Sequence, residues 1–146
     1  MFDKILKIQQ ELKVPKNRRN TFGNYNYRSA EDIVEAAKPL CHQEGFILNL
    51  TDEMVEVGGR VYVKATASIT DGEKAFNACG WARESEVLKG MTEAQITGAA
   101  SSYARKYALN GLFAIDDVAD ADATNTHGKE VSAKSVPLAE EEELEF

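Results

Sequence analysis

The sequence predicts an α+β fold, in which an antiparallel sheet of three to four strands is covered on one face by a helix. Residues 60–70 alternate without error between apolar and polar side chains, which is the pattern of a strand with one buried face. Thr92 and Gln95 then form a capping box, which satisfies backbone donors of a first helical turn. Strands followed by a helix laid over them are typical of the α+β class.

Two N-terminal helices are predicted before the sheet. Apolar side chains recur at helical spacing over residues 2–12, and this helix ends before Pro15. It packs either on its own domain or on a neighbouring subunit, and the sequence does not distinguish the two. A second helix begins at Ser29, which caps it, and runs to about Glu44. We expect Pro39 to bend or break this helix and Gly45 to close it.

The sheet is predicted from short apolar runs separated by two-residue turns. Residues 46–50 and 54–57 form short strands in this interpretation, and Gly58-Gly59 turns the chain into the strand over residues 60–70. A second turn at Asp71-Gly72 leads to a strand over about residues 74–83.

The covering helix is predicted from Thr92 to Asn110-Gly111, where two residues that tolerate the left-handed conformation end it. Its inner face consists of small side chains, which lets the helix backbone lie close to the sheet. These small residues are Gly98, Ala99, Ala100 and Ala104.

The chain of 146 residues has a formal net charge of −7, and the acidity is concentrated near the C-terminus. Residues 1–115 carry fifteen Lys and Arg against fourteen Asp and Glu, a net charge of +1, whereas residues 116–146 carry two against ten, a net charge of −8. We therefore expect one folded domain over residues 1–115, able to present a basic groove, and a flexible acidic tail over residues 116–146.

Composition also narrows the class of protein. No apolar run approaches the length needed to span a bilayer, and no signal peptide is recognisable, so we expect a soluble intracellular protein. Cys41 and Cys79 form no CxxC pair, which argues against a disulfide framework or a zinc site. Both cysteines are expected to be small core residues.

Two regions are predicted to bind a phosphate-lined partner. Residues 13–28 contain no acidic side chain, and their cations are interleaved with aromatic rings in a loop or irregular strand. Arg105 and Lys106 lie next to tyrosines on the covering helix. Cations neutralise phosphates and rings stack on bases. The alternatives are a solvated basic loop that buries Tyr25 or Tyr27, and a core helix with a solvated basic edge.

The same stretches resemble a known family. The run from Gln95 to Leu109, followed by Asp116-Asp117, is similar to the signature of the Erf family of bacteriophage recombination proteins. The resemblance extends upstream through residues 22–29 and covers roughly residues 15–122. It implies a β-β-β-α core, single-stranded DNA binding, ATP-independent annealing of complementary strands in the cytoplasm of the bacterial host, and homo-oligomeric rings or arcs with DNA in an outer groove.

With this resemblance, the two basic regions become one predicted DNA groove, and residues 1–115 a DNA-binding and oligomerisation domain. Phosphates are expected to lie between the residue 16–28 loop and the covering helix, with base edges free to find a complement. The predicted DNA contacts are Lys16, Arg18, Arg19, Tyr25, Tyr27, Arg28, Tyr103, Arg105 and Lys106.

No catalytic motif accompanies these residues. The sequence contains no GxxxxGK[ST] loop, no GxSxG elbow and no HExxH pair, so we expect neither an enzyme nor a cofactor. Two alternatives remain open. One is a single-strand nucleic-acid-binding module that does not anneal. The other is a metal-dependent nuclease that uses Asp116, Asp117, Asp120 and Asp122.

The acidic tail ends in Glu140-Glu141-Glu142-Glu143-Leu144-Glu145-Phe146, which weakly resembles the tails of bacterial single-strand-binding proteins. One hypothesis is that it competes with DNA for the basic groove or docks on a replication or single-strand-binding partner of the host or phage. The alternative is a tail that only keeps the protein soluble.

Overall fold

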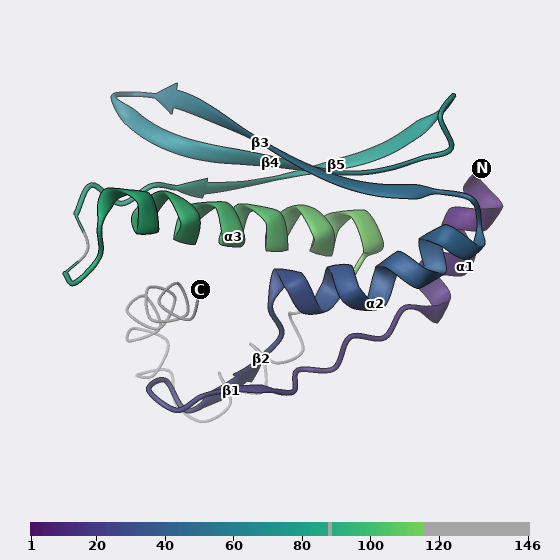
Figure 1. The fold of residues 1–146 in the computed structure, drawn as a ribbon, viewed down its shortest axis with the longest axis horizontal. Coiled ribbons are helices and arrows are strands. Elements are labelled where there is room, and N and C mark those ends of the chain that lie inside the picture. Colours follow the sequence, from purple (N-terminus) through teal and green to yellow (C-terminus); the bar gives the residue numbers. More distant parts are fainter. Residues whose placement is uncertain (88, 116–146) are drawn as a thin grey trace.

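A three-stranded antiparallel sheet, with the helices of the described residues on one of its faces, organises the fold (Figure 1). The computed structural model describes residues 1–87 and 89–115. The strand order is β3-β4-β5, and the α+β prediction is confirmed. The elements of this layer are β3 (Ile47–Val57), β4 (Arg60–Thr70), β5 (Ala75–Arg83) and α3 (Glu93–Phe113).

The central strand β4 separates a buried face of the sheet from an open one. Its residues Val63, Ala65, Ala67 and Ile69 are buried, and the residues between them are partly exposed, as the alternation predicts. The prediction of two short strands before Gly58 is wrong, because all eleven residues of β3 pair with β4. The polar segment at the middle of β3 lies at the sheet edge, where its side chains reach water without interrupting the backbone ladder.

Helix α3 begins as predicted and ends later than predicted. Thr92 and Gln95 form the capping box, but the helix continues through Asn110 and Gly111 to Phe113. Leu112 and Phe113 are buried, and their burial favours one more helical turn over the left-handed stop that Asn-Gly permits. The predicted inner face is correct except for Gly98, which is exposed.

Gly80 marks the closest approach of α3 to the sheet. A Cβ atom built on Gly80 would lie 2.3 Å from the Ala104 carbonyl oxygen and 2.4 Å from the Ala108 backbone nitrogen. Both distances are far below van der Waals contact, and both partners are backbone atoms that cannot turn aside. Helix and strand therefore touch backbone to backbone, which requires glycine at 80 and alanine at 104 and 108.

The N-terminal helices α1 (Phe2–Glu11) and α2 (Ala30–Gln43) lie on the same side of the sheet as α3 (Figure 1). Ser29 caps α2 through a capping box with Asp32, and Gly45, at φ 80°, follows the helix end as expected. Of the predicted bend or break at Pro39, the break does not occur, because α2 continues through this residue. Pro39 is exposed, so water can satisfy the carbonyl group that its missing N–H leaves unpaired.

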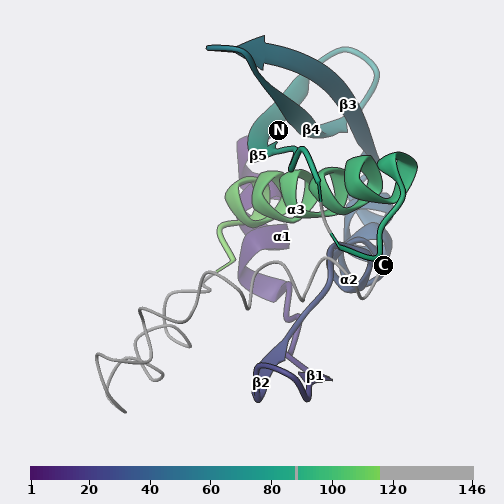
Figure 2. The same cartoon turned by 90° about the vertical axis from the view of Figure 1, so that its left-hand side faces the viewer.

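A small hairpin precedes α2 and projects from the body of the molecule, away from the sheet (Figure 2). Its strands are β1 (Arg18–Asn20) and β2 (Tyr25–Tyr27), within the segment predicted to be a loop or irregular strand. The buried Asn20 side chain donates to the Tyr25 hydroxyl at 3.1 Å and accepts from the Gly23 backbone at 2.9 Å. These two bonds hold the hairpin turn.

The cysteines occupy different environments. Cys41 is buried on α2, and desolvation raises the pKa of its thiol to about 11. The prediction that Cys79 is also a core residue is wrong, because the alternation of β5 places Cys79 on the open face of the sheet. None of the helices in residues 1–87 and 89–115 is both long and apolar enough to cross a membrane.

Replacing Gly80 by alanine is expected to lower the free energy of unfolding by about 3 kcal/mol, because the new methyl group overlaps backbone atoms of α3. Gly98→Ala is the matched control. Nothing lies within 4 Å of a Cβ at Gly98, so this change should stabilise α3 by about 0.5–1 kcal/mol. Urea denaturation measures both. Equal stability of the two variants would contradict the backbone contact at Gly80.

Candidate nucleic-acid interface

The two predicted binding regions meet at Lys106 and Tyr27. The Lys106 ammonium nitrogen lies 5.8 Å from the centroid of the Tyr27 ring, within cation–π range. The hairpin and α2 lie on the side of α3 that faces away from the sheet, as both ribbon views show (Figures 1 and 2). The hairpin and the C-terminal half of α3 therefore share one side of the molecule.

Arg105 emerges beside the edge strand β3. Its Nε donates to an Asp52 carboxylate oxygen at 3.0 Å, and the Ser101 hydroxyl donates to the other oxygen of the same carboxylate. Asp52 pairs with Ala65 in the sheet register, so it belongs to the side of the sheet that α3 covers. Asp52 holds the guanidinium group through Nε alone, which leaves its terminal N–H groups to face another ligand.

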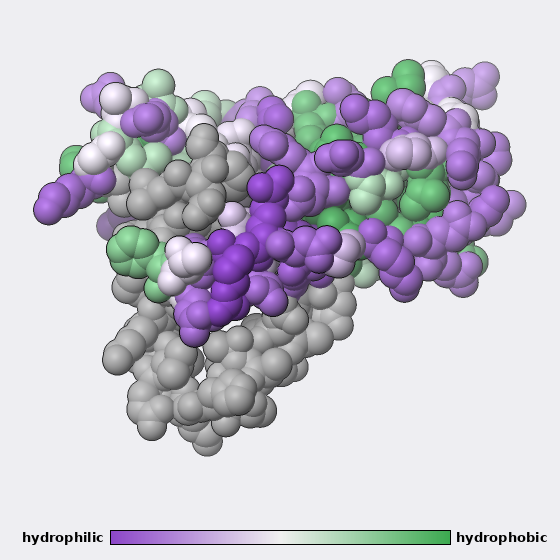
Figure 3. Space-filling view, turned by 60° about the horizontal axis from the view of Figure 1, so that its bottom comes forward, coloured by the Kyte–Doolittle hydropathy of each residue, from purple (hydrophilic) through white to green (hydrophobic). Residues whose placement is uncertain are grey.

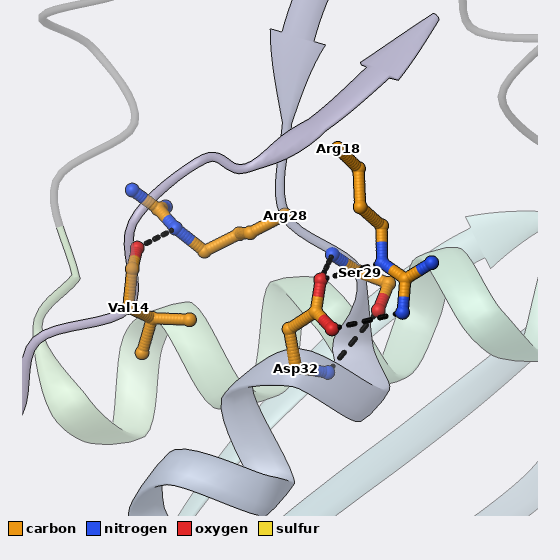
Figure 4. A network of polar contacts seen from close by, with 5 residues as sticks. All are labelled: Val14, Arg18, Arg28, Ser29 and Asp32. Atoms are coloured by element: carbon orange, nitrogen blue, oxygen red, sulfur yellow. Dashed lines mark hydrogen bonds and ion pairs between the residues drawn. The ribbon is translucent and has the colours of Figure 1, made fainter.

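Arg18 is bound differently, by a carboxylate that engages it through two donors (Figure 4). Its Nε and one terminal nitrogen donate to Asp32 at 2.7 Å and 3.0 Å. Asp32 also accepts from the Ser29 backbone at 2.9 Å as part of the α2 capping box. The hydrogen bond from Arg18 is the main cause that lowers the pKa of Asp32. Arg18 thus ties the hairpin to the start of α2.

Three predicted contact residues are buried, and their predicted roles are corrected. Tyr27 and Tyr103 are only 5% and 6% exposed, so neither ring offers an open face to a base. Arg28 is 7% exposed and donates from Nε to the Val14 carbonyl at 2.8 Å (Figure 4). These three side chains pack beneath the surface of the candidate site instead of lining it.

The remaining predicted residues stay at the surface. Arg19 is exposed on β1, where it donates to the side chains of Asn24 and Asn26 in its own hairpin. Tyr25 is half-buried, with its ring centroid 6.0 Å from that of Tyr27. Lys16 and Lys106 are half-buried as well. The predicted cations that stay at least partly exposed are Lys16, Arg18, Arg19, Arg105 and Lys106.

Two exposed rings were absent from the predicted contacts. Phe22, at the hairpin tip, is 83% exposed, and Tyr107 is 49% exposed, with its ring centroid 6.0 Å from that of Tyr103. Phe22 precedes Gly23 in a turn segment, and this is the sequence signal that could have placed its ring at the surface. Tyr107 follows Tyr103 by one helical turn, and spacing alone does not show which of the two rings is outside.

The surface is hydrophilic but less positive than the sequence indicates. Figure 3 looks onto the side that carries the hairpin, where hydrophilic side chains predominate among the described residues and apolar patches are smaller. Asp32 and Asp52 each neutralise one of the predicted cations. A separate hollow at the start of α3 is lined by three acids, Glu84, Glu86 and Glu93, and by two cations, Arg60 and Arg83.

Comparison with known proteins identifies the family. A family model described as the ERF superfamily matches residues 1–144. The chain belongs to the ERF superfamily. It is also 54% identical over 132 residues to the essential recombination function protein of Salmonella phage P22, which confirms the resemblance noted in the sequence.

This alignment covers 90% of the present chain and 63% of the phage P22 protein. The chain therefore spans less than two thirds of the length of this relative. No solved structure matches the chain significantly. Within residues 1–87 and 89–115, no group of three or more His, Cys, Asp or Glu side chains is placed to hold a metal ion. The nuclease hypothesis concerns Asp116, Asp117, Asp120 and Asp122, which lie outside the described residues, as does the predicted tail.

Asp32→Asn is expected to destabilise the domain by about 1 kcal/mol at pH 7, because it weakens both the Arg18 pair and the helix cap. Since the folded-state pKa of Asp32 is lowered, its stabilisation is present above the unfolded pKa of about 3.9 and is lost as pH falls through the lower, folded-state pKa. Thermal denaturation at several pH values measures the difference from wild type, which should shrink below about pH 4.

Glu31→Gln, one residue earlier in the same helix, is the control, because the Glu31 side chain is exposed and takes no part in the capping box. A stability difference between Asp32→Asn and wild type that stays constant down to the acid transition would contradict the Arg18 pair as its cause.

Proposed function

We propose that this ERF-superfamily protein binds single-stranded DNA and promotes annealing of complementary strands in phage homologous recombination, without ATP. The observation that carries the proposal is the contact between Lys106 on α3 and Tyr27 on the hairpin, which brings two basic regions far apart in sequence to one side of the molecule. The name of the phage P22 relative supports a role in recombination. The place of action would be the cytoplasm of the bacterial host.

The proposed mechanism uses backbone recognition. Phosphates contact Lys106, the outward N–H groups of Arg105, and Arg19 and Lys16 near the hairpin. The rings of Phe22, Tyr25 and Tyr107 offer stacking surfaces that do not depend on sequence. Base edges then stay available for pairing with a second strand. No bond is broken in annealing, so the proposal needs neither a catalytic residue nor a cofactor.

Assembly into a ring or an arc would place these interfaces in series along one strand. Edge strands present unpaired backbone groups, and β3 is an edge strand of the described sheet that also exposes Met54 and Val57. On α1, Phe2 and Leu6 are exposed one helical turn apart. The β3 edge and the exposed face of α1 are two different surfaces, and they suit a head-to-tail contact in which each subunit uses one surface for each neighbour.

The acidic tail over residues 116–146 is proposed to compete with DNA for the basic surface or to dock on a replication or single-strand-binding partner. Its net charge of −8 supports the competition. Deleting residues 130–146 would then raise DNA affinity at low salt or abolish partner capture. A deletion that changes neither would leave the tail with a solubilising role.

Replacing Arg105 and Lys106 together by alanine is expected to weaken binding of an oligothymidylate and to flatten its salt dependence. Each lost phosphate contact reduces the slope of log K against log salt by about 0.7 for a single strand. Fluorescence anisotropy of a labelled oligonucleotide between low and physiological salt measures both quantities. The control is Lys74→Ala, which removes one cation from an exposed position between β4 and β5, in the sheet layer.

A folded Arg105/Lys106 variant with unchanged affinity and slope would contradict the proposed interface. Annealing is tested separately, by the pairing rate of two labelled complementary oligonucleotides. A protein that binds single strands but does not accelerate their pairing would be the alternative, a non-annealing single-strand-binding module.

Met54→Glu with Val57→Glu is expected to shift the protein towards monomers, because charge on an edge strand opposes pairing with another chain. Sedimentation velocity at several protein concentrations measures the shift, and circular dichroism checks the fold. The predicted result is a large particle for wild type and a species near 16.1 kDa for the variant. An unchanged large particle would remove β3 from the proposed assembly contact.

A further inference from the structure

The outer face of the sheet is open, and it lies opposite the interface described above. All three helices and the hairpin lie on the other side of the sheet, as both ribbon views show (Figures 1 and 2). The outward residues of β4 are partly exposed, and those of β5 are exposed. This face therefore has no cover among the described residues.

Four outward side chains on β4 and β5 alternate between aromatic and cationic. In the strand register Tyr62 lies opposite Arg83, and the next outward pair is Lys64 opposite Trp81. The two rings thus lie on one diagonal and the two cations on the other. Side chains at such positions are within reach of one another. We call Tyr62, Lys64, Trp81 and Arg83 the outer quartet.

The outer quartet is positioned for contact with a ligand. Trp81, the largest ring in the chain, is 45% exposed. The Lys64 ammonium nitrogen lies 5.4 Å from the centroid of the Trp81 ring, which orders both side chains before any ligand arrives. A cation and a ring held together in this way can contact a phosphate and a base of the same strand.

The surroundings of the outer quartet favour an anionic polymer. Glu53 on β3 faces Lys64, and Arg60 lies next to the quartet at the start of β4, so the charged outward side chains here are three cations and one acid. Arg60 and Arg83 also line the hollow at the start of α3 that contains Glu84, Glu86 and Glu93. Further along the face, the outward residues are hydroxyl, amide and thiol side chains that can bond a sugar-phosphate backbone. They are Thr51, Thr66 and Cys79, followed by Asn49, Ser68 and Asn77.

We propose that the outer quartet is a second binding site for single-stranded nucleic acid, separate from the hairpin and α3. Exposed sheet faces with aromatic rings and cations bind single strands by stacking and phosphate contact. A second copy of the face would set cations against cations. The acidic tail is a poorer occupant of this face. It carries no aromatic residue before Phe146, so it could pair with the cations of the quartet but would not stack on its rings.

Trp81 is the single tryptophan of the chain, so its fluorescence reports on this site alone. The full chain is titrated at low salt with an unlabelled oligothymidylate while tryptophan emission is recorded. The expected result is saturable quenching. Lys64→Gln with Arg83→Gln should raise the half-quenching concentration about tenfold while circular dichroism stays unchanged. As a second readout, the oligonucleotide should slow maleimide labelling of the exposed Cys79.

The variants separate this site from the proposed function. In the Arg105/Lys106 double alanine variant, quenching should persist although anisotropy reports weaker binding. Quenching that disappears in that variant, or that is unaffected by Lys64→Gln with Arg83→Gln, overturns the second site. Binding seen by anisotropy without any quenching in wild type overturns it too and leaves the proposed function standing. If quenching occurs but anisotropy shows no loss of binding in the Arg105/Lys106 variant, the second site stands and the proposed interface on the hairpin and α3 is contradicted.

Two other occupants of this face are tested without DNA. An emission change that follows protein concentration alone would assign the face to a contact between copies. An emission change on deletion of residues 130–146 would assign it to the tail. Either result overturns the proposal, and constant emission in both experiments supports it.

Discussion

The backbone contact between α3 and β5 at Gly80 fixes the position of the helix that carries Arg105 and Lys106, two residues of the proposed interface. Because Ala104 and Ala108 lie against the strand without intervening side chains, α3 can neither slide nor rotate without a clash. The two residues that follow Ala104 then emerge at set positions. Arg105 reaches the β3 edge and Lys106 reaches the hairpin. The small side chains of α3 thus determine where its cations lie.

Two carboxylates give the basic residues different roles. Asp32 engages two donors of Arg18, so that arginine holds the hairpin to α2. Asp52 engages only the Nε of Arg105, which orients the guanidinium group and keeps its terminal donors available. The two predicted contact arginines therefore differ in role. Arg18 stabilises the surface, and Arg105 is suited to contact a ligand.

The sequence predicts the architecture better than it predicts the surface. Strand β4 and the caps at Ser29 and Thr92 follow from local periodicity and hydrogen bonding, and they are confirmed. The end of α3 differs from the prediction because burial of Phe113 outweighs the local Asn-Gly signal. Tyr27, Arg28 and Tyr103 were assigned to the surface because residue type shows what a side chain can bind, whereas burial depends on the packing of distant elements.

Photo-cross-linking tests most directly whether a single strand contacts the hairpin and α3 together. An oligonucleotide that carries 5-iododeoxyuridine is bound to the full chain and irradiated, and the cross-linked peptides are identified by mass spectrometry. The predicted result is cross-links both in the hairpin segment with Phe22 and Tyr25 and in the α3 segment with Tyr107. Cross-links that are absent from both segments, or confined to one of them, would contradict a shared interface.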